Sequence, residues 1–381
     1  MTVGIRAVAH RQVLNSHGEW TPELTLELAD GRRGRGAAPR GETPSIYERR
    51  NAAAEIPIAD IRSVLCGELF TQTSLDRELA DRQSTWGSDV VFALSTAFFA
   101  CQAVVVPADY RPRLLFNVVN GGSFARTNAV NADVAEVLLV SLTDDVAASV
   151  DGYRRLDAGV RRELGGAPLR IVDGRRVHDI GGAAANDRAI ELVTDLIELN
   201  RLETMFGVMV DASAGDWCDG NSYRLPVTGT ALESAALVDY WSRLVERHPI
   251  MFLEDPFAEV DFDSWREFHE VRRDGCRVFA DNFTSTNPAE LTTKAQLTDG
   301  VIVKPDQNGT VSGTRALDLT HGVLAVSQCT HPGLLRLRQV ELRHQRGRAA
   351  HQQLGVEPDR HERGAKAEVV ARQRVVGGQD A

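Results

Sequence analysis

Four short apolar segments in the second half of the chain each end in an ionisable residue. FGVMV is followed by Asp211, IMFL by Glu254, RVFA by Asp281 and VIV by Lys304. Amphipathic stretches such as ESAALVDYWSRLVERH and SWREFHEVRRD lie between them and are typical of helices. Short strands without a polar face, alternating with helices, indicate a parallel sheet that is buried on both sides. The pattern predicts an α/β fold with a (β/α) barrel, in which chemistry collects at the C-terminal ends of the strands.

The first part of the chain predicts a different architecture. Residues 1–48 alternate like strands and then become rich in glycine, which indicates a small antiparallel sheet leading into a loop. Residues 58–106 indicate helices, and the stretch DVVFALSTAFFACQAVVV is apolar nearly all round, as expected of a buried helix. A chain of 381 residues is long enough for more than one core. We therefore expect a smaller α+β domain over residues 1–110 and the barrel over residues 111–330.

Charge and cysteine content narrow the expected partners and compartment. The formal net charge of −10 argues against nucleic acid or an anionic membrane as the main partner. The sequence has no apolar run of about 18 residues, and its N-terminus lacks the apolar core of a signal peptide. The five cysteines are scattered without a CxxC pair, as in reduced cytoplasmic proteins. We expect a cytoplasmic protein that binds a small molecule, and neither nucleic acid nor a membrane.

The last 51 residues, 331–381, differ from the rest of the chain. They contain none of its Phe, Trp or Tyr residues but four of its ten histidines. They show no strand-like apolar run, so we expect no closing strand here and a barrel that is incomplete at its C-terminal end. This composition is also what translation in a shifted reading frame would give, and a natural, lineage-specific tail is the alternative. Resequencing the gene around codon 330 distinguishes the two.

The four strand-end residues suit one kind of chemistry. Carboxylates from separate strands are hard oxygen ligands of the type that Mg²⁺ prefers. A bound divalent ion can neutralise a substrate carboxylate and stabilise the anion formed when the neighbouring carbon loses a proton. Lys304 on the next strand can accept that proton, which a guanidinium cannot do. Such acids can instead cap helices or pair with arginines, but four in register on successive strands favour a catalytic site.

Several segments resemble enolases, and they occur in the same order between residues 5 and 327: SIYE, FNVVNGGS, MVDAS, FLEDPFAE, FADNFTSTNP and VIVKPDQNGT. The resemblance implies an enolase-type barrel with an N-terminal capping domain, and a homodimer. It also implies that Asp211, Glu254 and Asp281 hold Mg²⁺ and that Lys304 is the base. The loop PRGETPSIYE resembles the enolase capping loop, and Thr43 stands where enolases have a serine that closes over the substrate and a second Mg²⁺.

The chain departs from the enolase pattern at positions that serve dehydration. Phe124 replaces the histidine after NGGS, and Ala132 and Asp133 replace a Gln-Glu pair. Ile180 replaces the acid of the Asp-Glu-Gly-Gly motif, and Cys329 stands where an arginine would hold phosphate. The second active-site lysine of enolases has no aligned counterpart, because Lys366 lies in no matching motif. An apolar side chain cannot protonate a leaving hydroxide, so the chain keeps the proton-abstracting half of the machinery and lacks the dehydrating half.

This pattern is similar to that of carboxyphosphonoenolpyruvate synthases of phosphinothricin-type antibiotic pathways, which are divergent members of the family. The resemblance implies a Mg²⁺-dependent enzyme that acts on a small phospho- or phosphono-carboxylate. Two alternatives stay open. The first is ordinary enolase activity, the conversion of 2-phosphoglycerate to phosphoenolpyruvate. The second is an enolase-like protein without catalytic activity that works through protein contacts.

Overall fold

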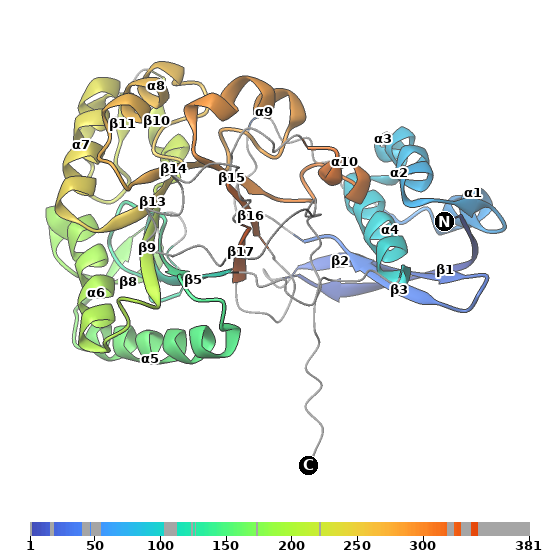
Figure 1. Ribbon diagram of the computed structural model, residues 1–381, viewed down its shortest axis with the longest axis horizontal. Coiled ribbons are helices and arrows are strands. Elements are labelled where there is room, and N and C mark those ends of the chain that lie inside the picture. The colour runs from blue at the N-terminus through green and yellow to red at the C-terminus, as the bar shows by residue number, and fades with distance from the viewer. Residues whose placement is uncertain are drawn as a thin grey trace, which may run out of the picture.

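The computed structural model describes residues 2–15, 19–39, 46, 55–102, 113–122, 125, 127–172, 174–220, 222–317, 324–328 and 337–341. An N-terminal sheet with its helices lies beside a barrel of strands surrounded by further helices (Figure 1). Each part has its own cluster of buried apolar side chains. Among the described residues, no helix combines the length and the apolar character that crossing a membrane requires.

The N-terminal sheet is antiparallel, as its sequence predicts. Its strands follow the order β3-β2-β1-β4 and span Val3–Leu14 (β1), Trp20–Leu28 (β2), Arg33–Ala37 (β3) and Leu69–Phe70 (β4). Helix α4 packs closely on β3, because a Cβ atom added to Gly34 or Gly36 would lie 2.1 Å and 2.2 Å from carbonyl oxygens of the helix. The two glycines therefore set the distance between helix and sheet.

Helices cover this sheet where the sequence predicts them. They span Ile58–Leu65 (α1), Gln72–Asp81 (α2), Gln83–Trp86 (α3) and Ser88–Cys101 (α4). α4 contains residues 89–101 of the stretch predicted to be buried, and residues 103–106 of that stretch lie outside the described residues. The helix begins after Gly87, whose positive φ of 87° ends the preceding turn. Most α4 side chains are buried, including Val91, Leu94 and Phe98. The short strand β4 was not predicted from the sequence.

The second sheet closes into a barrel in the order β13-β14-β15-β16-β17-β5-β6-β9. Its strands are Arg113–Asn120 (β5), Glu136–Ser141 (β6), Phe206–Asp211 (β9), Ile250–Glu254 (β13), Arg277–Ala280 (β14), Gly300–Val303 (β15), Leu324–Gln328 (β16) and Leu337–Glu341 (β17). The four strands predicted from apolar runs are β9, β13, β14 and β15, and they are neighbours with parallel pairing. The barrel prediction is thus confirmed.

Two strands run against the direction of the others. β6 is antiparallel to both β5 and β9, and β17 is antiparallel to both β16 and β5. β17 lies in the segment for which we expected no closing strand, so that detail is corrected, while the C-terminal end of the described barrel is still incomplete in its helical layer. Strand pairing uses backbone N–H and C=O groups, and a segment without an apolar run can supply them to two open edges.

The helical layer is incomplete at the C-terminal end of the described barrel. α10 (Val311–Arg315) is the single helix described between β15 and β16, and no described helix follows β17. The predicted domain boundaries at residues 110 and 330 and most of the tail lie outside the described residues. The reading-frame hypothesis therefore stays a prediction.

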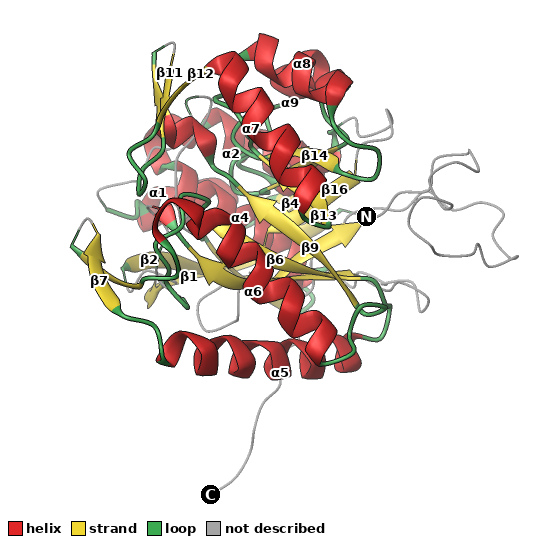
Figure 2. Ribbon diagram, turned by 90° about the vertical axis from the view of Figure 1, so that its left-hand side faces the viewer, coloured by secondary structure: helices red, strands yellow, loops and turns green. Residues whose placement is uncertain are grey.

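The remaining helices pack on the outside of the barrel, as Figure 2 shows for α5, α6 and α7. They span Val146–Gly165 (α5), Ala185–Leu199 (α6), Ser234–Arg247 (α7), Phe262–Val271 (α8) and Pro288–Lys294 (α9). Several have the side-chain caps that such helix starts require. The Asp145 carboxylate accepts the N–H of Ala148 at the start of α5, and the Asp261 carboxylate accepts the N–H of Ser264 at the start of α8.

Apolar side chains fill the inside of the barrel. Met209, Phe252, Phe279 and Ile302 belong to one buried cluster there, and the rings of Phe252 and Phe279 lie 4.8 Å apart. Gly300 makes room for this packing, since a Cβ atom at that position would lie 2.3 Å from the Phe279 ring. The barrel is a packed core, so its chemistry is confined to the strand ends.

Short elements decorate the loops between strands and helices. The strands β7 (Leu169–Val172) and β8 (Arg175–His178) form an antiparallel hairpin. A second small sheet contains Cys218–Asp219 (β10), Ser222–Arg224 (β11) and Ala231–Glu233 (β12). Turns of 3-10 helix span Gly182–Ala184, Ala214–Trp217 and Ala295–Leu297.

Candidate active site

Three carboxylates lie at the same end of three neighbouring strands. Asp211 is the last residue of β9 and is paired in register with Glu254, the last residue of β13. Asp281 directly follows β14, the next strand. All three side chains are buried, with exposed fractions of 6% for Asp211, 0% for Glu254 and 7% for Asp281. The structure thus places the three predicted metal ligands on adjacent strand ends.

The predicted base contacts one of these acids. Lys304 follows β15, and its Nζ atom lies 2.5 Å from Oδ2 of Asp281. Lys304 is itself 8% exposed, so this ion pair is shielded from solvent. The second oxygen of Asp281, Oδ1, is buried and accepts no hydrogen bond from the described residues. A buried carboxylate oxygen of this kind is suited to a further donor or a cation.

The backbone of Lys304 is held by Thr286, a residue for which sequence reasoning proposed no role. The Lys304 N–H donates to Thr286 Oγ1 at 2.9 Å, and that hydroxyl donates to Gln307 Oε1 at 2.8 Å. Thr286 has a positive φ of 55°, which is uncommon for a β-branched residue. Thr286 lies in the motif DNFTSTNP, so the sequence already marked the segment that positions the base.

Asp255 is a further buried acid that the sequence analysis did not single out. Its carboxylate accepts the backbone N–H groups of Asp281 at 3.0 Å and of Asn282 at 2.7 Å. Burial raises the pKa of Asp255 well above its usual value, and the nearby negative charges of Asp281 and Asp211 raise it further. The hydrogen bonds from Asp281 and Asn282 fix the start of the loop after β14.

Glu136 adds another carboxyl group at this end of the barrel. It is paired in register with Asp211 and is 4% exposed. The sequence analysis looked for acids at the last residue of each strand. Because β6 runs antiparallel to β9, its first residue lies at the end where β9 finishes, and Glu136 was therefore missed.

The donor chemistry of these residues fits Mg²⁺, which prefers carboxylate oxygens. As they stand, however, no three described His, Cys, Asp or Glu side chains are grouped closely enough to hold a metal ion. Asp281 instead faces Lys304. Asp211, Glu254 and Asp281 remain the predicted ligands on the strength of residue type and strand position.

The position at which enolases have an acid in their Asp-Glu-Gly-Gly motif carries no carboxyl group. The Ile180 side chain is partly buried and packs against the apolar core of the barrel, while its N–H donates to Asn131 Oδ1 at 2.8 Å. The adjacent Asp179 accepts hydrogen bonds from Gly181 N–H at 3.2 Å and Asn131 Nδ2 at 2.9 Å. The Gly181 bond in particular lowers the pKa of Asp179, so this neighbour is ionised and is a poor proton donor at neutral pH.

Asp133 replaces the second residue of the enolase Gln-Glu pair, and its carboxylate takes part in hydrogen bonds that hold neighbouring loops. It is 1% exposed, and one carboxylate oxygen accepts the N–H groups of Val227 at 2.7 Å and Thr228 at 3.0 Å. Asn186 Nδ2 lies 3.3 Å from the other oxygen and donates to the Tyr240 hydroxyl at 2.7 Å. This network fixes loops around the barrel end, and Ala132 beside it is fully buried.

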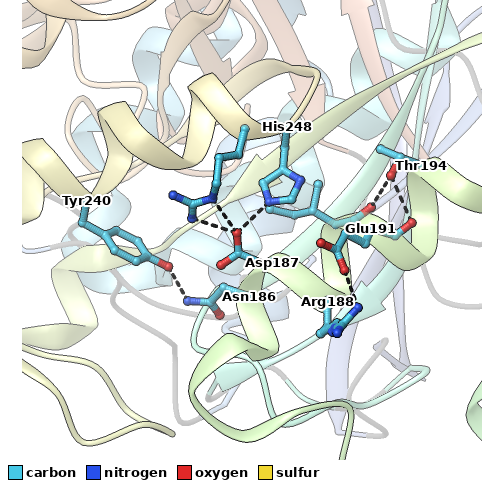
Figure 3. Close-up of polar contacts among 9 residues, drawn as sticks. Asn186, Asp187, Arg188, Glu191, Thr194, Tyr240 and His248 are labelled. Atoms are coloured by element: carbon cyan, nitrogen blue, oxygen red, sulfur yellow. Dashed lines mark hydrogen bonds and ion pairs between the residues drawn. The ribbon is translucent and has the colours of Figure 1, made fainter.

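Two neighbouring residues, Asn186 of that network and Asp187, hold the start of α6, which directly follows the Ile180 loop. Figure 3 shows the Tyr240 hydroxyl facing Asn186 and the His248 ring facing Asp187. His248 Nε2 lies 2.7 Å from Asp187 Oδ1, and Arg247 donates to the same oxygen at 2.7 Å. Burial works to raise the pKa of Asp187, but the hydrogen bonds from His248 and Arg247 outweigh it and lower that pKa. The ionised carboxylate therefore ties α6 to α7.

Other residues named from the sequence lie outside this group. Thr43, Phe124, Cys329 and Lys366 fall outside the described residues. Lys294 is fully buried, and its Nζ donates to the Phe283 carbonyl at 2.6 Å and pairs with Glu290 at 2.9 Å rather than with a strand-end acid. Lys304 is therefore the lysine that the structure brings to the strand-end acids.

Comparison with known proteins agrees with this arrangement. Residues 109–323 match a family described as "Enolase, C-terminal TIM barrel domain". The enolase of Sulfurimonas denitrificans (strain ATCC 33889 / DSM 1251) is 27% identical over 346 residues, which cover 80% of this chain and 80% of that protein. The strand-end acids, Lys304 and six of the barrel strands (β5, β6, β9, β13, β14 and β15) lie within the matched region.

Proposed function

This chain belongs to the enolase family, and we propose that it is a Mg²⁺-dependent enzyme that removes a proton next to the carboxylate of a small phospho- or phosphono-carboxylate. One observation carries the proposal. Lys304 Nζ lies 2.5 Å from Asp281 at the ends of neighbouring barrel strands, with Asp211 and Glu254 on the next two strand ends. A proton acceptor beside several buried acids is the arrangement that proton abstraction in the presence of a divalent ion requires.

In this reaction Lys304, as the neutral amine, takes the proton from the carbon next to the substrate carboxylate and so breaks that carbon–hydrogen bond. The proton passes to Nζ, and the electron pair stays on the substrate as an enediolate. Mg²⁺ held by Asp211, Glu254 and Asp281 would neutralise the substrate carboxylate and stabilise that negative charge. Thr286 fixes the backbone of Lys304 through a 2.9 Å hydrogen bond, so the amine approaches from one direction.

The second half of the reaction is proposed to differ from dehydration. Ile180 supplies no proton donor, and its neighbour Asp179 is held as an ionised carboxylate. Asp133 is occupied by backbone N–H groups. These contacts support a reaction in which no hydroxide leaves with the help of this loop, and our best assignment is that of a carboxyphosphonoenolpyruvate synthase. That Thr43 closes over the substrate, and that the enzyme is a cytoplasmic homodimer, are parts of the same proposal.

A panel of phospho- and phosphono-carboxylates, incubated with the full-length enzyme and Mg²⁺ and followed by phosphorus NMR, tests the proposal. We expect conversion of a phosphonate-containing substrate and little phosphoenolpyruvate from 2-phosphoglycerate. Lys304→Gln is the inactive control, because it keeps a polar side chain, one bond shorter, without a basic amine. Robust formation of phosphoenolpyruvate from 2-phosphoglycerate would contradict the synthase assignment and indicate ordinary enolase activity.

Calorimetry with Mg²⁺ tests the metal independently of turnover. We expect saturable binding by the wild-type chain and weaker binding by Asp211→Ala, because that variant loses a predicted ligand. A wild-type chain that binds no Mg²⁺ at millimolar concentration would contradict the catalytic proposal and favour an enolase-like protein without activity.

A further inference from the structure

We propose that a surface pocket beside α5 binds a small anion that carries a phosphate group. The pocket has a volume of about 300 Å³. It is lined by Arg161, Leu164 and Gly165 from α5, Arg176 and His178 from β8, and the Asn128–Ala129 turn. Figure 2 shows the hairpin strand β7 following the end of α5, which brings β8 next to that helix end. None of the strand-end acids nor Lys304 lines this pocket.

Two different elements, α5 and β8, each contribute an arginine to the pocket. Arg176 and His178 are two residues apart on β8, so their side chains point to the same face of that strand. Arg161, Leu164 and Gly165 are three and four residues apart on α5 and therefore share one face of the helix. Both the helix and the strand thus contribute an arginine to the lining of the pocket.

The charges of the pocket favour an anion. Arg161 Nε donates to Asp157 Oδ2 at 2.9 Å, which orients the guanidinium and leaves its terminal nitrogens for other acceptors. The other oxygen of Asp157 accepts Asn128 Nδ2 at 2.9 Å. Arg176 forms no ion pair with the described residues. The lining residues thus include two arginines and no carboxylate, and the one carboxylate among the described residues that contacts them is Asp157, which is paired with Arg161.

His178 supplies a polar atom that requires a partner. Its Nδ1 is buried and makes no hydrogen bond with the described residues. The backbone of His178 is fixed, because its N–H donates to the Ala129 carbonyl at 2.7 Å and its carbonyl accepts the Asn131 N–H at 3.1 Å. A buried imidazole nitrogen without a partner is costly, and a turn of the His178 ring toward a bound anion would relieve that cost.

Size and geometry together point to a phosphate ester or inorganic phosphate. A volume of about 300 Å³ is at the small end of ligand pockets and exceeds what a single monatomic ion needs. A Cβ atom added to Gly165 would meet no atom within 4 Å, so this wall is open to a ligand. Guanidinium groups match the oxygens of a phosphate in charge and in spacing. The site is independent of the proposed reaction.

Titration of the full-length protein with inorganic phosphate, in EDTA and at constant ionic strength, tests this inference by calorimetry. We expect saturable binding that Arg176→Ala weakens by about tenfold or more, because a charge-assisted hydrogen bond is lost. Arg175→Ala is the matched control, since its side chain points to the opposite face of β8 and should leave the affinity unchanged. His178→Ala should weaken binding as well.

Three results would overturn the proposal. The first is a wild-type protein that shows no saturable binding at millimolar phosphate. The second is an equal loss in Arg175→Ala and Arg176→Ala, which would indicate general attraction to basic residues. The third is binding that Lys304→Gln abolishes while Arg176→Ala does not, which would place the phosphate at the strand ends. Arg176 is exposed, so its replacement is not expected to unfold the chain.

Discussion

The lysines show how the surroundings of a residue decide its role. Only three lysines accompany the many arginines of this chain, and a lysine can give up and take a proton where an arginine cannot. Lys294 is packed over the Phe283 ring at 4.4 Å and is paired with Glu290, so it is a structural residue. Lys304 lies against Asp281 at a strand end. Both residues belong to a rare residue type in this chain. Their positions relative to the barrel strands distinguish the structural lysine from the predicted base.

Replacing Lys304 by arginine should remove proton abstraction and keep the fold. The guanidinium can still pair with Asp281, but it remains charged and cannot accept a proton. We expect the rate of proton exchange at the carbon next to the substrate carboxylate to fall by about 10²–10⁴-fold. Deuterium incorporation followed by proton NMR measures this rate, and thermal unfolding serves as the control. Exchange at the wild-type rate in Lys304→Arg would rule this residue out as the base.

Close contacts between elements explain why some positions need a glycine, which the sequence pattern alone does not reveal. Gly36 of β3 lies directly under α4, where an added Cβ atom would be 2.2 Å from the Ala93 carbonyl oxygen. A backbone atom cannot move aside without shifting the helix. The glycine-rich stretch suggested a loop, whereas part of it forms a strand that needs small residues for packing against α4.

Gly36→Ala should therefore destabilise the N-terminal part by at least about 3 kcal/mol. Urea unfolding followed by circular dichroism measures the loss. Gly4→Ala is the matched control in the same sheet, because a Cβ atom there meets its nearest neighbours at 3.4 Å, an ordinary contact. Equal stability of the two variants would show that α4 does not approach β3 as closely as the structure indicates.

A buried acid joins the N-terminal part to the barrel. Asp76 of α2 is 3% exposed and accepts hydrogen bonds from Ser95 Oγ at 2.7 Å and from the Ser312 N–H at 2.7 Å. Ser95 Oγ also accepts the Val311 N–H at 2.9 Å. The bonds from Asp76 and Ser95 satisfy N–H groups at the start of α10, the helix that follows the Lys304 segment.

Asp76→Ala should cost about 1–3 kcal/mol or more, because it leaves buried donors without an acceptor. It should also separate the unfolding of the N-terminal part from that of the barrel, which differential scanning calorimetry can resolve. Glu78→Ala on the same helix removes a half-exposed ion pair with Arg82 and should cost less than about 1 kcal/mol. A single unchanged transition in Asp76→Ala would contradict this role.

At the scale of the whole molecule, the sequence predicted features that depend on local pattern. Apolar strands ending in ionisable residues placed Asp211, Glu254 and Lys304 correctly on barrel strands, because each signal is contained in a few neighbouring residues. Features that depend on strand direction or on distant partners were missed. Glu136 joins the site because β6 is antiparallel, and the pairing of β17 depends on two strand edges far away in sequence.

Buried cysteine thiols and a buried tyrosine hydroxyl should make the folded state less stable at alkaline pH. Burial raises the pKa of Cys101 to about 11, that of Cys276 to about 12 and that of Tyr240 to about 12. The unfolded chain loses these protons at lower pH, with thiols ionising near pH ~8.5. Stability is therefore fully present below the unfolded values and is lost as pH rises, by up to ~1.4 kcal/mol per pH unit for each group.

Urea unfolding between pH 8 and pH 11 measures this dependence. Cys276→Ala should lower stability overall through loss of packing, yet show a flatter decline above pH 9 than the wild-type chain, because one raised pKa is gone. Parallel declines in the two proteins would contradict a contribution from this thiol.

Closure of the barrel depends on a strand from the compositionally unusual tail. β17 pairs with β16 on one side and with β5 on the other, so its removal would leave two strand edges open.

We expect a chain that ends at residue 341 to be more soluble and more cooperative in unfolding than one that ends at residue 336. The two chains differ only in the five residues of β17, Leu337–Glu341, so the comparison isolates that strand. Size-exclusion chromatography and thermal unfolding give the measurement, with aggregation expected for the shorter chain, because open edges recruit other strands. Identical behaviour of the two chains would show that β17 does not close the barrel in solution, and it would strengthen the hypothesis that the tail results from a shifted reading frame.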